Sequence, residues 1–172
     1  YYGSGRIYVW APGGGSPATH VVGIVGTDIY SPGVILREAH NVTVQGLTFQ
    51  YASGHGVEVY ANNVVFDDCT FEFNGKAEFH VYAYGNATAD NVTIQNSRVY
   101  HNVLTNWPRG QGGFKWCCWA MGIVSNGTPN FKAIGNIVHK NGGEGIGAYS
   151  GSGGTIIRDN ISYDNWSVNI YV

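Results

Sequence analysis

Three titratable residues have the types and the spacing needed for acid–base chemistry: Glu58, Glu78 and His80. Glu58 and His80 lie about 22 residues apart, the length of one sequence repeat. If each repeat forms one coil of stacked strands, their Cα atoms lie about 5 Å apart. A carboxylate at that distance favours the charged imidazolium, so the two could form an acid/base pair. Glu58 and Glu78 could instead supply the two carboxylates of a glycoside hydrolase, about 5 to 10 Å apart. The simpler alternative is an ion pair between coils on an exposed sheet.

A tryptophan-rich insertion at residues 103–121 interrupts the repeats. Its candidate substrate-binding residues are Trp107, Arg109, Lys115, Trp116 and Trp119. Aromatic ring faces suit the C–H groups of sugars, and a cationic side chain could neutralise the carboxylate of a uronate. The insertion precedes a strand of the sheet that carries Glu58 and His80, so we expect it to hang over the outward face of that sheet. Tyr60 and Tyr82 lie on the same face and are further candidate substrate-binding residues. The alternative is that the tryptophans only fasten a long loop to the wall, although long ordered loops usually serve a function.

The elements that must position these residues are five repeats of short alternating segments. The units begin at Asn41, Asn63, Asn91, Asn130 and Gly154. Each unit has three stretches of period two separated by Gly, Asn or Asp, which predicts three short strands with one face buried. Equivalent positions hold like residues, as at Val57, Phe79 and Ile146, and Ile123 joins them if extra residues are allowed in the third unit.

These repeats predict a parallel β-helix in which equivalent residues stack into vertical rows. An asparagine column would lie in a turn, where its amides can bond along the stack; its positions are Ala52, Asn74, Asn102, Asn141 and Asn165. The alternative is a β-sandwich of hairpins. It would need two-residue Asn-Gly turns between antiparallel strands, but pairs such as Asn74-Gly75 do not space the strands as hairpins.

Composition narrows the class of protein further. The chain has 172 residues, 26 of them Gly, and charged residues make up 12%, about half the usual share of 25%. The net charge is −2 without a basic run, so nucleic acid is not an expected partner. No apolar stretch reaches the roughly 20 residues of a membrane span. Cys69 is expected to be buried in the core, whereas Cys117 and Cys118 are neighbours in the insertion.

Several segments resemble the right-handed parallel β-helix proteins of the pectate-lyase-like superfamily. They are NVTVQGLTF, NVTIQNSRVYHN, TIIRDNISYDNWSVNIYV and the opening GRIYVWAPGGGSPATH. The resemblance implies a secreted protein, but the superfamily includes lyases, hydrolases, epimerases and non-catalytic adhesins. It also implies Ca²⁺ as a cofactor. No cofactor is evident from the residues themselves, and the adjacent carboxylates of Asp67 and Asp68 are only a weak candidate for a calcium site.

The sequence therefore predicts an all-β, right-handed, single-stranded parallel β-helix of about six coils with three short strands each. Residues 1–32 would form N-terminal strands or a cap, and residues 33–172 the coils. The chain ends within a predicted strand, so we expect it to be C-terminally incomplete, with self-association through the last coil as a candidate.

The predicted function is that of an extracellular or cell-surface enzyme of lyase or glycoside hydrolase type. It would bind polysaccharide on the outward face formed by the third strand of each coil. Glu58, Glu78 and His80 would be its catalytic residues. The alternative is a non-catalytic structural or adhesive solenoid that stacks into fibres or binds surface glycans.

Overall fold

The computed structural model describes residues 32–76, 79–83, 89–104 and 121–172, together with three two-residue strands near the N-terminus. Those three are β1 (Tyr2–Gly3), β2 (Arg6–Ile7) and β3 (Val22–Gly23). β1 and β2 form an antiparallel pair. No helix in the described ranges is both long and apolar enough to cross a membrane.

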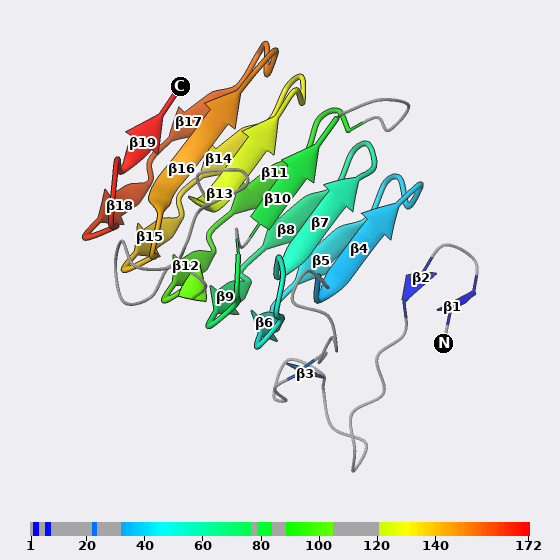
Figure 1. The fold of residues 1–172 in the computed structure, drawn as a ribbon. Helices are drawn as coiled ribbons and strands as arrows, with labels where there is room; N and C mark the ends of the chain where they lie inside the picture. The colour runs from blue at the N-terminus through cyan, green and yellow to red at the C-terminus, as the bar shows by residue number, and fades with distance from the viewer. Residues whose placement is uncertain are drawn as a thin grey trace.

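The remaining strands form three parallel sheets that run along the molecule (Figure 1). The third-strand sheet consists of β4 (Val34–Arg37), β7 (Val57–Tyr60), β10 (Phe79–Tyr82), β13 (Met121–Asn126), β16 (Glu144–Tyr149) and β19 (Ile170–Tyr171). The first-strand sheet consists of β5 (Thr43–Gln45), β8 (Val65–Asp67), β11 (Thr93–Gln95), β14 (Lys132–Ile134) and β17 (Ile156–Arg158). The second-strand sheet contains β3, β6 (Thr48–Gln50), β9 (Thr70–Glu72), β12 (Arg98–Tyr100), β15 (Ile137–His139) and β18 (Ile161–Tyr163).

The observed register confirms the predicted stacking. Val57 pairs with Phe79, Phe79 with Ile123, and Ile123 with Ile146, so the row continues past the insertion. The result is a right-handed parallel β-helix with five complete coils, preceded by a partial coil made of β3 and β4. The count is close to the six coils that the repeats predict.

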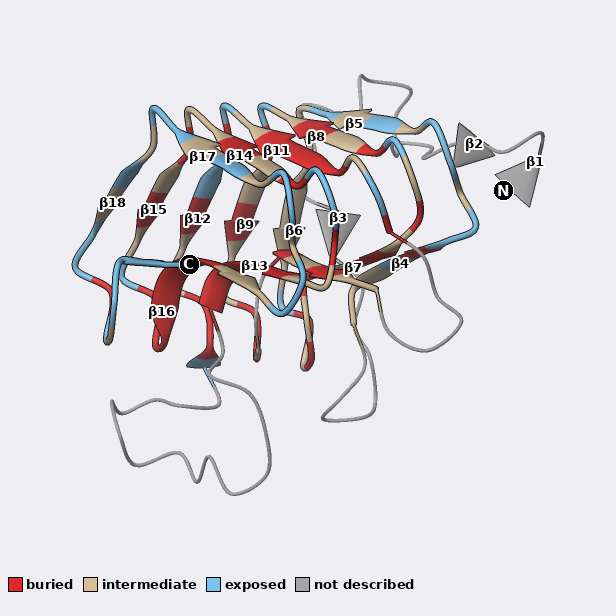
Figure 2. Ribbon diagram, turned by 90° about the horizontal axis from the view of Figure 1, so that it is seen from above, coloured by how far each residue is buried: buried red, intermediate tan, exposed pale blue. Residues whose placement is uncertain are grey.

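Buried residues occur on the strands of all three sheets (Figure 2) and form one hydrophobic core. Strands β7 and β10 alternate between buried and partly exposed residues, which is the pattern of a sheet with one face inside. Phe66, Phe71 and Phe79 are fully buried and their rings contact one another. Cys69 is also buried, as predicted. The outward residues of the same strands are therefore the ones that remain available for chemistry.

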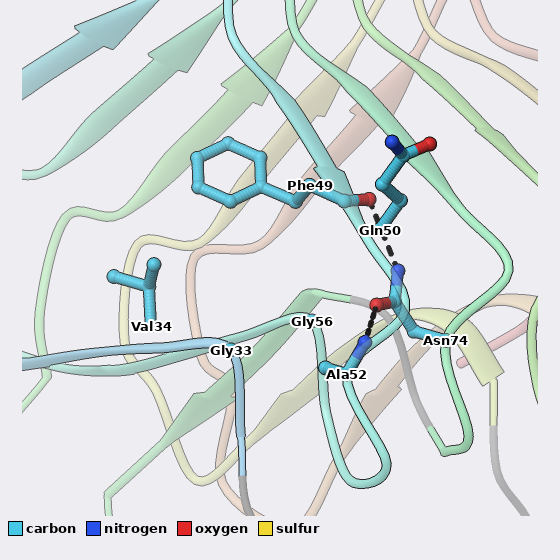
Figure 3. Close-up of a pocket in the computed structure, with 7 residues that line it drawn as sticks. All are labelled: Gly33, Val34, Phe49, Gln50, Ala52, Gly56 and Asn74. Atoms are coloured by element: carbon cyan, nitrogen blue, oxygen red, sulfur yellow. Dashed lines mark hydrogen bonds between the residues drawn. The ribbon is translucent and has the colours of Figure 1, made fainter. Parts of the chain in front are cut away.

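Buried asparagines bond the coils together at one turn, as the sequence predicts. The backbone N–H of Ala52 donates to Asn74 Oδ1 (2.7 Å), that of Asn74 to Asn102 (3.0 Å), and that of Asn102 to Asn141 (3.1 Å). The Asn74 amide also donates to the Phe49 carbonyl, so one side chain makes two hydrogen bonds to the preceding coil (Figure 3). Each amide thus satisfies backbone groups that would otherwise be buried without partners.

A second ladder, which the sequence does not predict, occupies the turn between the first and second strands. The backbone N–H of Cys69 donates to Ser97 Oγ, that of Ser97 to Asn136 Oδ1, and that of Asn136 to Asn160 Oδ1. A backbone requirement explains another column, because Asn41 (φ 59°) and Gly154 (φ 74°), like the other unit-opening residues, adopt the left-handed conformation. Asn and Gly tolerate this conformation best.

The Asn-Gly pairs join coils rather than form hairpins. Gly75 N–H donates to the Ala52 carbonyl, and Gly142 N–H to the Asn102 carbonyl, each at 2.8 Å. A Cβ atom at Gly75 would collide with the Ser53 carbonyl oxygen of the preceding coil. Glycine is therefore needed there because the backbones of two coils approach closely. The strands on either side of the turn pair in parallel with those of the preceding coil, which excludes the hairpin alternative.

We predict that the ladder contributes strongly to stability. Asn102→Ala removes the acceptor of the Asn74 N–H and the donor to the Phe71 carbonyl. These two backbone groups would then be buried without those hydrogen bonds. The free energy of unfolding should fall by about 2–4 kcal/mol, measured by urea denaturation. The control is Gln45→Ala, which removes an exposed amide bonded to Asp67 and should change stability by less than about 0.5 kcal/mol. Equal effects of the two variants would contradict a structural role for the ladder.

Candidate functional site

The outward face of β7 and β10 brings together two of the three predicted catalytic residues. His80 pairs directly with Glu58 in the parallel register. The predicted alignment of this pair is confirmed, whereas their catalytic roles stay predictions. Their neighbours in the same strands, Val57 and Phe79, point inward and are fully buried in the core. The pair therefore sits on a rigid, well-packed wall.

His55 is a third member of the cluster that sequence reasoning missed. Its Nε2 lies 3.7 Å from Glu58 Oε1, and its ring centroid lies 4.6 Å from that of His80. The sequence Gly-His-Gly indicates a tight turn, in which a histidine has no evident chemical role. Its position three residues before Glu58 was the available signal, because the turn returns the chain to the same face.

Tyr60 fixes the orientation of the carboxylate. Its hydroxyl donates to Glu58 Oε2 at 3.0 Å, which leaves Oε1 directed toward His55. Burial, followed by the charge of Glu58, raises the pKa of Tyr60 to about 12, so the phenol keeps the proton that it donates. The Arg37 guanidinium lies over the Tyr60 ring, 5.0 Å from its centroid, and stabilises it by a cation–π contact.

The electrostatics of His80 differ from the expectation of a charged imidazolium. Burial lowers the pKa of His80 to about 3, and the nearby positive charges of His55 and Lys76 act in the same direction. The expectation considered the carboxylate of Glu58 and omitted desolvation, which here has the larger effect. His80 is therefore a neutral imidazole and a weak base at pH 7, and its unprotonated ring nitrogen is of a type that can bind a metal ion.

Several predicted site residues lie outside the described residues. These are Glu78, Trp107, Arg109, Lys115, Trp116 and Trp119, together with Cys117 and Cys118. Of the predicted substrate-binding residues, Tyr60 and Tyr82 are described. Their rings meet edge to face at 6.0 Å, and Tyr82 also contacts the His80 ring at 5.0 Å. The described part of the site is thus an aromatic surface beside a carboxylate and two imidazoles.

Another carboxylate occurs on the same sheet but far from this cluster. Glu144 is buried and accepts a hydrogen bond from the Tyr149 hydroxyl at 2.9 Å. Burial and the bond to Glu144 raise the pKa of Tyr149. Since β16 is three strands from β7, the two carboxylates are separated by about 14 Å at a strand spacing of 4.8 Å. They are too far apart for the carboxylate pair of a glycosidase.

The outward column of the second-strand sheet forms an aromatic stack. The His139 ring lies between those of Tyr100 and Tyr163, at 5.2 and 4.9 Å, and nearly parallel to both. Burial raises the pKa of Tyr100, and the hydrogen bond that its hydroxyl donates to Glu72 acts in the same direction. The outward residues of this sheet therefore contact one another along the stack.

Neither hollow found among the described residues includes Glu58 or His80. The first, about 30 Å³, lies inside the coil beside Gly33, Phe49 and Asn74 (Figure 3) and can hold about one water molecule. The second, about 470 Å³, lies at the last coil beside Tyr149, Ser152 and Val172. The candidate site therefore lies outside these two hollows, on outward side chains of β7 and β10.

The residues of the cluster do not fit the Ca²⁺ ion that the family resemblance implies. Calcium takes about six to eight oxygen ligands, whereas the cluster offers a single carboxylate and two imidazoles. Asp67 is used elsewhere, because its two oxygens accept hydrogen bonds from Asn96 and Gln45.

We predict that His80 stays neutral far below pH 6.5. In the unfolded chain the imidazole binds a proton near its ordinary pKa of 6.5, but in the folded chain only near 3. Its contribution to the free energy of unfolding is therefore constant above pH 6.5 and falls as the pH decreases toward 3. Ring resonances of His80, assigned by comparison with His80→Gln, should not titrate between pH 7 and 4.5. A midpoint at or above 6.5 would show that Glu58 dominates instead.

Comparison with known proteins agrees with this architecture. A crystal structure of pectate lyase Pel9A superposes with a TM-score of 0.56 at 16% sequence identity, over 76% of this chain and 32% of the other. The chain thus spans about a third of that protein, and the likeness concerns the fold. A search of curated proteins gave no match. The model of the right handed beta helix region matches residues 7–172, so the chain belongs to the right-handed β-helix family.

Proposed function

We propose that this chain binds and cleaves an acidic polysaccharide by lyase-type β-elimination on the outward face of β7 and β10. The observation that carries the proposal is the neutral imidazole of His80 beside Glu58 and the rings of Tyr60 and Tyr82. A neutral imidazole has a nitrogen lone pair that can take a proton, but a pKa of about 3 makes it a weak base, so the proposal requires bound substrate to raise the pKa of His80. Aromatic rings supply the flat apolar surface on which sugar rings pack.

The proposed reaction has a simple balance of bonds. A ring nitrogen of His80 takes the proton from the carbon next to the uronate carboxylate. The electrons of that C–H bond form a carbon–carbon double bond, and the bond to the neighbouring glycosidic oxygen breaks. The departing oxygen takes a proton from solvent. Arg109 or Lys115 would neutralise the carboxylate, and Trp107, Trp116 and Trp119 would extend the sugar-binding surface.

A lyase is preferred to a glycoside hydrolase because of the carboxylates. Glu144, a second carboxylate of this sheet, lies three strands from Glu58, beyond the separation that hydrolysis needs. A hydrolase mechanism would therefore depend on Glu78 as its second carboxylate. Acidic polysaccharides occur in cell walls and matrices, so the proposal implies a location outside the cell or on its surface.

A non-catalytic solenoid that binds glycans or forms fibres is the second candidate. It is favoured by the stack of Tyr100, His139 and Tyr163 on the second-strand sheet, which could bind a sugar chain without a nearby base. This candidate predicts binding without turnover. It also predicts that substitutions of His80 leave glycan affinity unchanged.

We predict that His80→Gln lowers cleavage of an acidic polysaccharide by about 10²- to 10⁴-fold, because it removes the proton acceptor. Activity is followed by the ultraviolet absorbance of unsaturated sugar ends and, in parallel, by reducing ends. The matched control is Glu72→Gln on the second-strand sheet, which should keep the activity of the wild type. Reducing ends without ultraviolet absorbance would identify a hydrolase. A wild-type protein that binds glycan but is inert on a broad panel would favour the non-catalytic solenoid.

A further inference from the structure

We propose that His55, Glu58 and His80 form a binding site for a divalent transition-metal ion such as Zn²⁺. Each residue offers one ligand atom, and the three atoms lie within 4.8 Å of one another. In the described part of the chain, this is the group of three His, Cys, Asp or Glu residues that meets such a criterion. The residues come from two coils, so the folded register creates the site.

The distances are close to those of a metal site. Zinc bonds to nitrogen and oxygen are about 2.0 to 2.2 Å long, so ligand atoms in a tetrahedral site lie about 3.4 Å apart. His55 Nε2 and Glu58 Oε1 are 3.7 Å apart, too far for a hydrogen bond but within a few tenths of an ångström of that separation. All three ligand atoms lie within 4.8 Å of one another, so reaching that separation requires the widest pair to approach by at most about 1.4 Å.

The donor types select the class of metal. Two imidazoles and one carboxylate suit Zn²⁺, Fe²⁺ and similar ions, whereas Ca²⁺ and Mg²⁺ prefer oxygen ligands. The His55 and Glu58 side chains are each 16% exposed. The remaining coordination position would therefore be open to water, as in metal sites with three protein ligands.

The protein holds the three ligands in place before any metal arrives. The His55 carbonyl accepts a hydrogen bond from Gly33 N–H at 2.8 Å, and the Gly54 carbonyl accepts one from Lys76 N–H at 2.9 Å. The turn that carries His55 is thus fastened to the coils on both sides. Tyr60 orients Glu58 through its hydrogen bond, as the outer partners of metal ligands commonly do.

The alternative is an ion pair between His55 and Glu58 without a metal. An ion pair does not need a second imidazole, yet the ring of His80 lies 4.6 Å from that of His55. Two imidazoles beside one carboxylate are what a metal ion uses. Lys76 opposes the binding of a cation, because its positive charge reaches His80.

The test measures metal binding directly, without polysaccharide. Chelator-treated protein is titrated with Zn²⁺ by calorimetry, and with Co²⁺ by visible absorption, which reports the coordination geometry. We expect one ion per chain with a micromolar or lower dissociation constant. His55→Ala and His80→Ala should each weaken binding by more than about 100-fold, and Tyr60→Phe by about 10- to 100-fold, as for other outer partners.

Two further variants make the test specific. His139→Ala removes a histidine near His101 on the second-strand sheet and should leave the affinity for Zn²⁺ unchanged. Lys76→Met removes the opposing charge and should tighten binding. Circular dichroism of each variant shows whether it is folded. The proposal is overturned if the wild type binds no Zn²⁺, or if His139→Ala abolishes binding and His55→Ala does not.

Metal binding and cleavage can be separated experimentally. The metal site rests on the geometry of the cluster and not on the proposed function, so it stands or falls on the binding data. If both proposals hold, a bound ion would occupy the nitrogen that His80 needs as a base. Zn²⁺ should then inhibit cleavage, and a chelator should restore it. Inhibition that persists in His55→Ala would place the inhibitory ion elsewhere.

Discussion

The register between successive coils is the constraint on which every feature of this molecule depends. Three parallel sheets and two ladders of polar side chains hold residues of neighbouring coils directly over one another. A slip by one residue would move every inward side chain to the outer face. It would expose Phe79 and bury His80, so the same register that closes the core also presents the site.

The register alone does not determine the chemistry of the site. It places Glu58 beside His80, but a simple pair of this kind would form a charged ion pair. Two further contributions lower the pKa of His80. The first is burial of the imidazole, and the second is repulsion between a protonated His80 and the positive charges of His55 and Lys76. The result is a neutral histidine beside a carboxylate that is already bonded to Tyr60.

Much of the fold follows from the sequence because it depends on repeated residue types. Two features can be predicted because each of their positions accepts few side chains. They are the apolar row from Val57 to Ile146 and the ladder of Asn74, Asn102 and Asn141. The second ladder could not be predicted, because Cys69, Ser97 and Asn136 differ in chemistry and share only their position in the stack. The protonation state of His80 also escaped prediction, because desolvation is a property of the assembled surface.

The turns explain why His55 could not be found from the columns. His55 and Glu144 occupy equivalent positions, two residues before the aligned Val57 and Ile146, and each follows a glycine. Both side chains reach the outward face: His55 lies beside Glu58, and Glu144 accepts a bond from Tyr149. The inward rows must remain apolar to preserve the core, but this turn position is free of that demand. A chain of this architecture can therefore change its chemistry at the turn before the third strand while its coils stay the same.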